Sequence, residues 1–175
     1  MFRMKRYTKV FFAAIAIVLM VVSGGCFRYT LNGASIDYTV YHTIRISNFP
    51  IRAALVYSQL QTIFETELTE YITRNTRLQT VDGAADVELE GEITGYNLTP
   101  QAVGEDAYAT RTRLTITVRV KYTDNRKESN NIDQSFSAFR DFDSSVMLND
   151  VQDQLCTEIS KEIIELIFNA TIGNW

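Results

Sequence analysis

The sequence has few of the residues on which most enzymes and metal sites depend. Its 175 residues include one histidine, two cysteines, two prolines and one tryptophan. It contains no Gly-x-Ser-x-Gly turn, no His-Glu-x-x-His pair and no glycine-rich phosphate loop, which are local patterns of hydrolases, zinc proteases and nucleotide-binding proteins. With His42 as the only histidine, a zinc site would need unusual ligands. We therefore expect a protein that is not an enzyme and that holds no metal or other cofactor.

The sequence also lacks an apolar run long enough to span a bilayer. Its longest run, residues 10–22, has 13 residues, whereas a membrane-spanning helix needs about 20. Four basic residues precede this run: Arg3, Lys5, Arg6 and Lys9. Small residues, Ser23 to Gly25, follow it. A basic start, an apolar middle and small residues before a cleavage point are the layout of a secretory signal peptide, so we expect residues 1–25 to be removed.

Cys26 follows these small residues directly. The arrangement resembles a bacterial lipobox, which implies that Cys26 becomes the lipid-bearing first residue of the mature protein. Two other interpretations remain: a plain secretory signal cut near Gly25, which leaves Cys26 as a free thiol, and a short retained membrane anchor. If Cys26 carries lipid, Cys156 has no disulfide partner. Cys156 falls within a helical apolar pattern, and we expect it to be a small buried side chain.

The charge balance is acidic. The chain has 17 basic and 21 acidic residues, a formal charge of −4. Because residues 1–25 contain four basic and no acidic residues, their removal leaves 13 basic and 21 acidic residues, a formal charge of −8. Nonspecific binding to nucleic acid depends on Lys and Arg that neutralise phosphates. We therefore expect no nucleic-acid partner.

The hydrophobic periodicity predicts strands and two helices. Strands are expected at residues 38–47, 87–98, 108–123 and 132–142, with a shorter one at 76–81. Helices are expected at 54–75 and about 145–169, the second capped by Asp143, Ser144 or Ser145. His42 falls on the apolar side of the first strand.

The two clearest strands, 87–98 and 108–123, have one apolar and one polar face. Such strands form a sheet that is covered on one side. The pattern predicts an α+β fold, a two-layer sandwich of two amphipathic helices on a mostly antiparallel sheet of about four strands. We expect residues 26–36 to be a lipidated tether and residues 37–175 to be a single domain.

Charged side chains alternate along the polar faces of these two strands. If the strands are antiparallel neighbours, the glutamates of the first lie beside the basic residues of the second: Glu88, Glu90 and Glu92 beside Arg113, Arg119 and Lys121. One interpretation is a solvated ladder of ion pairs that sets the register. The other is a surface that meets anionic lipid headgroups or a partner, which the surplus Arg111 and Lys121 favour. The candidate contact residues are Arg111, Arg113, Arg119 and Lys121.

An ordered series of short motifs resembles the LptE-like lipopolysaccharide-assembly lipoproteins, in the form found in Bacteroidetes. It starts with Gly25-Cys26, Tyr29, Gly33 and Ser35, and continues with Gly91-Glu92-Ile93-Thr94-Gly95-Tyr96, Thr99-Pro100 and residues 113–120. It ends with Gln134-Ser135-Phe136-Ser137, Asp143-Ser144-Ser145, Ile167-Phe168-Asn169 and Asn174-Trp175. These motifs extend over nearly the whole chain after Cys26.

The resemblance implies a non-enzymatic lipoprotein that is anchored in the outer membrane. Members of this family act as plug and assembly factor of a large LptD-type β-barrel, and some bind lipopolysaccharide through basic residues. Residues 27–36 contain no acidic residue, and Arg28 is basic, which favours the periplasmic side over export to the cell surface. The alternative is a stand-alone periplasmic lipoprotein that binds lipid or another ligand, for which we expect a deep apolar pocket between helices and sheet.

Overall fold

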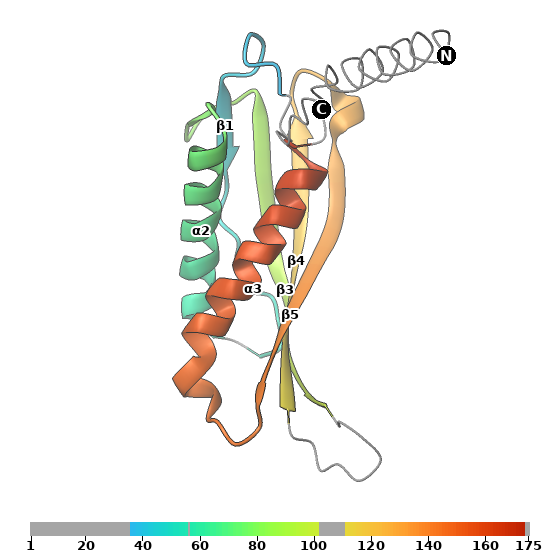
Figure 1. Cartoon of the computed structure of the whole chain (residues 1–175). Coiled ribbons are helices and arrows are strands. Elements are labelled where there is room, and N and C mark those ends of the chain that lie inside the picture. The colour runs from blue at the N-terminus through green and yellow to red at the C-terminus, as the bar shows by residue number, and fades with distance from the viewer. Residues whose placement is uncertain (1–35, 56, 102–110, 174–175) are drawn as a thin grey trace, which may run out of the picture. The chain divides into compact units, whose positions relative to one another are not determined.

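The computed structural model describes residues 36–55, 57–101 and 111–173. Residues 1–25, Cys26 and Trp175 lie outside these ranges. The elements follow in the order β1 (Thr43–Ile46), α2 (Gln59–Asn75), β2 (Gln79–Thr80), β3 (Val87–Gln101), β4 (Arg111–Asp124), the 3₁₀ turn η1 (Glu128–Asn130), β5 (Ile132–Asp143) and α3 (Leu148–Ala170). The strands form one sheet in the order β2-β1-β3-β4-β5, and both helices cover the same face of it (Figure 1).

The three long strands form an antiparallel meander, as the alternating sequence predicts. β3 pairs with β4 from Val87↔Asp124 to Gln101↔Arg111, and one register shift lies between Ile93 and Gly95. β4 pairs with β5 along the whole length of β5 up to Ile132. Every second residue of these strands points toward the helices, where apolar side chains are buried, so the expected α+β sandwich is confirmed.

The start of the domain differs from its expected structure. The predicted strand 38–47 is reduced to four residues, because the carbonyl of Asp37 accepts the N–H groups of Val40 and Tyr41 in a turn. β1 then runs parallel to β2 and to β3, so the sheet is mixed and has five strands rather than about four. The expected position of His42 on the apolar side was wrong, since His42 is exposed and Tyr41 and Ile44 are buried.

After β1 the chain continues along β3 and sends one aromatic side chain into the core. The N–H of Ser47 donates to Leu89, and the carbonyl of Pro50 accepts from Ile93. Phe49, between them, is fully buried. Its ring occupies the space over Gly91, where an added Cβ would lie 2.6 Å from the ring. The same Cβ would lie 2.3 Å from the carbonyl oxygen of Arg119 on β4, so glycine is required where the strand approaches both groups closely.

The two helices supply the other half of the core. In α2 the buried residues recur every four positions at Leu60, Phe64, Leu68 and Ile72. In α3 they are Leu155, Cys156, Ile159, Ser160, Ile163, Ile164, Ile167 and Phe168. Cys156 is fully buried, as expected, and desolvation raises the pKa of its thiol to about 12, so the thiol stays protonated.

Both helices begin later than the sequence predicts. α2 starts at Gln59 instead of residue 54, and α3 starts at Leu148 instead of about 145. The carboxylate of Asp143 accepts the N–H and the hydroxyl of Ser145, which forms a turn before the helix. The residue at the N-cap position is Met147, whose side chain makes no capping hydrogen bond. The predicted cap was therefore wrong, because the same side-chain chemistry also stabilises turns.

Candidate functional site

The face of the sheet opposite the helices carries polar side chains, and we call it the open face. It consists of residues from the three long strands: Glu88, Glu90 and Glu92 of β3; Arg111, Arg113, Thr115, Thr117, Arg119 and Lys121 of β4; Asp133, Ser135, Ser137, Phe139, Asp141 and Asp143 of β5. All four basic residues predicted as contacts lie on it. They form two groups, because Thr115 and Thr117 separate Arg111 and Arg113 from Arg119 and Lys121.

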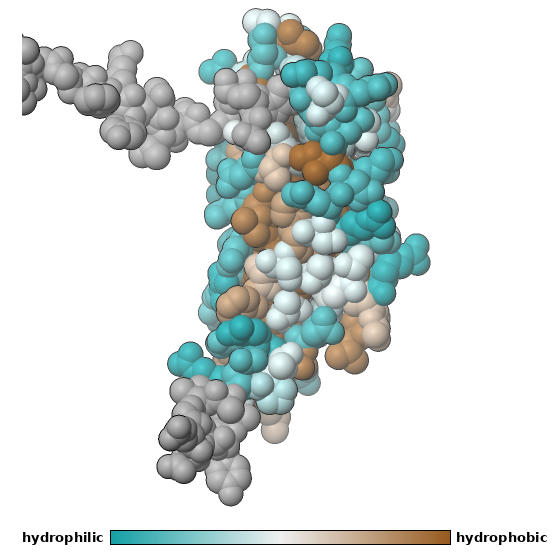
Figure 2. Space-filling model, turned by 90° about the vertical axis from the view of Figure 1, so that its right-hand side faces the viewer, coloured by the Kyte–Doolittle hydropathy of each residue, from teal (hydrophilic) through white to brown (hydrophobic). Residues whose placement is uncertain are grey.

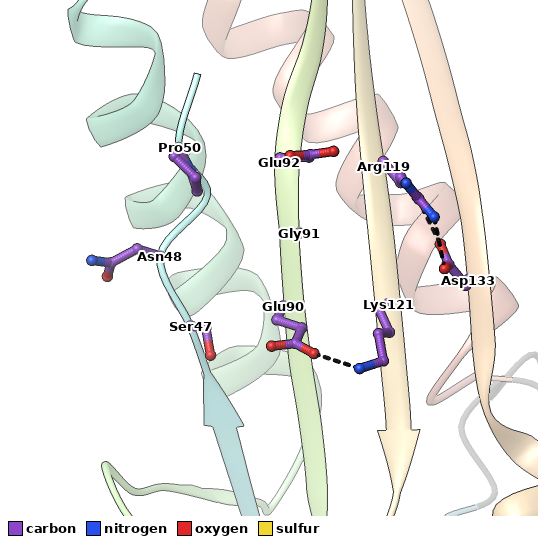
Figure 3. Close-up of a pocket in the computed structure, with 9 residues that line it drawn as sticks. All are labelled: Ser47, Asn48, Pro50, Glu90, Gly91, Glu92, Arg119, Lys121 and Asp133. Carbon is purple, nitrogen blue, oxygen red and sulfur yellow. Dashed lines mark hydrogen bonds and ion pairs between the residues drawn. The ribbon is translucent and has the colours of Figure 1, made fainter. Parts of the chain in front are cut away.

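Arg119 and Lys121 each pair with a carboxylate on a neighbouring strand, Arg119 on β5 and Lys121 on β3. Arg119 donates through Nε and Nη2 to the two carboxylate oxygens of Asp133, both at 2.9 Å. Lys121 donates to Glu90 at 2.9 Å (Figure 3). Glu92 lies directly across from Arg119 in the register but makes no ion pair with it. The predicted ladder of glutamates and basic residues is thus partly correct, and the role of Asp133 was not expected from the sequence pattern.

Arg113 is held more firmly than the other basic residues. Its guanidinium donates to both carboxylate oxygens of Asp141, at 2.7 and 2.9 Å, and lies 3.7 Å from the centre of the Phe139 ring. This ion pair lowers the pKa of Asp141. Bidentate pairing and stacking on an aromatic ring both restrict the side chain. We conclude that Arg113 is committed to its neighbours in this state of the molecule.

Arg111 differs from the other three basic residues. It is exposed, and it makes no ion pair within 4 Å among the described residues. Asp143 lies across from it on β5, but its carboxylate accepts hydrogen bonds from Ser145. The positive charge of Arg111 lowers the pKa of Asp143, although the hydrogen bonds from Ser145 have the larger effect. Of the four predicted contacts, Arg111 is the one that has no carboxylate partner among the described residues.

The charges of the open face nearly cancel. Its four basic residues stand among six acidic ones, and a fifth cation, Arg45 of β1, pairs with Glu88. Between the charged groups lie hydroxyl-bearing residues, and Thr117 and Ser137 bond to each other at 3.0 Å. A surface of this kind offers both donors and acceptors to a partner. It is not a basic patch of the type that attracts polyanions over a distance.

A shallow hollow of about 340 Å³ opens on the same face, beside the segment Ser47–Pro50 that follows β1, and extends across β3 to β4 and β5. Its charged lining residues are Glu90, Glu92, Arg119, Lys121 and Asp133 (Figure 3). Charges of both signs make the hollow suitable for a polar side chain and unsuitable for an acyl chain.

The gap between helices and sheet that the described residues enclose is much smaller. The gap there is lined by apolar residues, including Leu68, Leu89 and Phe168, and it does not admit a water molecule. The described ranges also contain no group of three or more acidic, histidine or cysteine side chains placed to hold a metal ion. Nor does any helix within them have the length and apolar character to cross a membrane.

Fold and site together define a class of protein: a two-layer α+β domain with two helices on one face of a mixed sheet and a charge-balanced polar surface on the other. The chain belongs to the LptE family of lipopolysaccharide-assembly proteins, whose family model matches residues 41–171. None of the curated proteins matches the chain.

Several solved structures of bacterial proteins are similar to the chain at low sequence identity. A hypothetical protein from Chlamydia trachomatis is similar with a TM-score of 0.52 and 12% identity, covering 74% of this chain and 97% of that one. A minor lipoprotein from Acinetobacter baumannii has a TM-score of 0.48 and 18% identity, with 73% and 90% covered. The uncharacterized lipoprotein B from Nitrosomonas europaea has a TM-score of 0.48 and 12% identity, with 73% and 79% covered. At 12% identity, the similarity to the Chlamydia trachomatis protein shows only that the fold is shared.

Proposed function

We propose that the protein is a non-enzymatic lipoprotein subunit of the lipopolysaccharide translocon, which acts as plug and assembly factor of an LptD-type outer-membrane β-barrel. The observation that carries this proposal is the family match over residues 41–171. In this proposal Cys26 bears the lipid that holds residues 37–175 at the periplasmic side of the outer membrane. The sequence before Cys26, with its basic start and short apolar run, supports such an anchor.

The open face is the surface that we assign to the barrel. A barrel lumen is lined with polar side chains and water, so a plug needs a polar surface that can exchange hydrogen bonds with it. The open face has this composition, with hydroxyl groups between balanced charges. Arg111 is the basic residue best placed to meet an acidic group of the barrel or a phosphate of lipopolysaccharide. Arg113, Arg119 and Lys121 would first have to leave their present carboxylates.

The alternative, a stand-alone lipoprotein that binds a lipid or another ligand, receives no support from the interior. Such a protein needs an apolar pocket of several hundred cubic ångströms for its ligand. The gap between helices and sheet admits no water molecule, and the hollow on the open face is charged. We therefore favour the assembly subunit.

Affinity purification of the full-length chain from its own cells tests this proposal. With a C-terminal tag and mild detergent, we expect a large outer-membrane β-barrel to accompany the chain in mass spectrometry. Arg111→Glu should reduce the amount of barrel several-fold, whereas the control Arg74→Glu, on an exposed arginine of α2, should leave it unchanged. Depletion of the protein should strand lipopolysaccharide in the inner membrane. Recovery of the chain without any barrel would refute the proposed partnership.

A further inference from the structure

Arg111 is one of two charged side chains of the open face that have neither an ion pair nor a side-chain hydrogen bond among the described residues. The other is Glu92 of β3. Arg119 lies across from Glu92 in the register, but its guanidinium donates to both carboxylate oxygens of Asp133 instead. One positive charge therefore stands between two carboxylates, and Glu92 is the carboxylate without a partner.

Glu92 lines the shallow hollow of the open face. The other four charged residues of the lining form two ion pairs with each other (Figure 3). With three carboxylates and two cations in its lining, the hollow has a formal charge of −1. In Figure 3 the side chain of Glu92 points across the sheet toward β4, and no interaction reaches it. The hollow thus lacks one positive charge.

The wall of the hollow next to Glu92 suits a long side chain with a charged end. Pro50, whose carbonyl accepts the N–H of Ile93, lies beside Glu92 and contributes an apolar ring (Figure 3). An aliphatic stem can lie along this ring while its polar end reaches the carboxylate. Lysine and arginine have both parts, because their charged groups are carried on chains of methylene groups. An acidic side chain would instead meet a like charge.

We propose that the hollow receives a lysine or arginine side chain that projects from the lumen wall of the barrel and pairs with Glu92. This inference rests on the proposed function, because the open face is the surface assigned to the barrel. A barrel that covers this face removes water from Glu92, and a carboxylate that loses water without gaining a partner destabilises the complex. A basic side chain replaces that water and cancels the charge of the hollow.

Together with Arg111, Glu92 gives the open face two points of opposite charge. Eight residues of β4 separate Arg111 from Arg119, the neighbour of Glu92, which corresponds to about 26 Å. Uncharged residues such as Thr115 and Thr117 lie between them. Seen from the side of the molecule on which β5 lies in Figure 1, a band of weakly polar side chains lies between hydrophilic regions (Figure 2). The barrel should present a basic group at one point and a negative group at the other, which fixes the orientation of the plug.

Charge variants of Glu92 test this inference through affinity purification of the full-length chain. Glu92→Gln keeps the size of the side chain and should reduce recovery of the barrel at least three-fold. Glu92→Lys reverses the charge and should reduce recovery at least ten-fold. Glu70→Gln and Glu70→Lys, on an exposed glutamate of α2, are the matched controls and should leave recovery unchanged. Circular dichroism of each purified chain shows whether it is folded.

A photoreactive amino acid at Ser47, which lines the hollow, locates the partner group. In living cells we expect it to crosslink the full-length chain to a lumen segment of the barrel that contains lysine or arginine. Replacement of that basic residue by glutamate should restore recovery with the Glu92→Lys chain to at least half of the original amount, because the pair again has opposite charges. The same barrel variant should be recovered poorly with the Glu70→Lys chain.

Three results would overturn the inference. The first is unchanged recovery of the barrel with folded Glu92→Gln and Glu92→Lys chains. The second is a crosslink from position 47 to a barrel segment without a basic residue, to a lipid or to another protein. The third is a charge exchange that restores nothing. If the unsubstituted chain still recovers the barrel in these cases, the inference fails and the proposed function stands. If no barrel accompanies the unsubstituted chain, both fail.

Discussion

The two faces of the sheet share the same strands but have different chemistry. On the face beneath α2 and α3, apolar side chains such as Ile116 and Val118 are fully buried. On the open face the alternating residues Thr115, Thr117 and Arg119 are hydroxyl-bearing or charged and contact solvent. In a strand that alternates in this way, one half of the residues packs into the core and the other half is available to contact a partner. Stability should therefore depend on the first face, and partner binding on the second.

Removal of one aromatic ring from the core, between α2 and the covered face of the sheet, should have the largest effect on stability. Phe64 is fully buried, and its ring lies 5.1 Å from that of Phe49. We expect Phe64→Ala to lower the free energy of unfolding by about 3–5 kcal/mol, measured by urea denaturation. The matched control is Phe139→Ala on the open face, whose ring is 46% exposed. Equal losses for the two variants would contradict the division between the faces.

A methyl group added to the covered face should also destabilise the protein. Gly91→Ala places a Cβ 2.6 Å from the ring of Phe49, which is itself enclosed by the core. We expect a loss of about 1–3 kcal/mol, because both the ring and the carbonyl oxygen of Arg119, 2.3 Å from the added Cβ, must shift in a packed environment. Gly83→Ala, at a position with open space around it, is the control and should be nearly neutral. The same denaturation measurement compares them, and a neutral Gly91→Ala would mean that neither the Phe49 ring nor the backbone of β4 is fixed at this position.

The pH dependence should come chiefly from Asp86 at the margin between the faces. The backbone N–H of His42 is the main cause that lowers the pKa of Asp86, with further bonds from Arg126 and Thr43. Because the folded pKa lies below the unfolded value of about 4, this stabilisation is present above pH 4. It is lost as the pH falls through the folded pKa.

We therefore expect unfolding free energies to fall below pH 4 in the unsubstituted protein. Asp86→Asn should cost about 1–3 kcal/mol at pH 7 and should reduce this acid sensitivity. Denaturation curves at a series of pH values measure both effects. A parallel pH dependence in the two proteins would show that other carboxylates dominate.

Much of the fold was predictable because its signals are local. β4 alternates without interruption from Leu114 to Tyr122, and α3 repeats its apolar residues at helical spacing. The structure of residues 36–55 was not predictable, since it depends on contacts distant in sequence. Asp86 binds the N–H groups of His42 and Thr43, and β1 finds parallel partners in strands that follow it.

The candidate site was predictable in composition but not in its pairing. Alternation placed Arg111, Arg113, Arg119 and Lys121 on one face, which the structure shows. The basic residues of β4 have two neighbouring strands, β3 and β5, from which a carboxylate can come. Arg113 and Arg119 pair with Asp141 and Asp133 of β5. Periodicity within one strand contains no information about the register of the next. For the same reason the isolation of Arg111 became visible only in three dimensions.

The smallest effect on stability is expected from the ion pairs of the open face. Arg119→Gln removes the exposed pair with Asp133, and such pairs contribute little because water and salt screen them. We expect the midpoint of urea denaturation to stay within experimental error, at low and at high salt. A clear shift would indicate that the open face supports the fold and is less available to a partner than we propose.

Site-specific photocrosslinking in living cells tests the account most directly, because it asks which face meets the barrel. A photoreactive amino acid at Thr115 on the open face is compared with one at Lys161, an exposed position of α3. We expect the full-length chain to crosslink to a large outer-membrane β-barrel from position 115 and far less from position 161. Crosslinks to the barrel from position 161 alone, or from neither position, would contradict it.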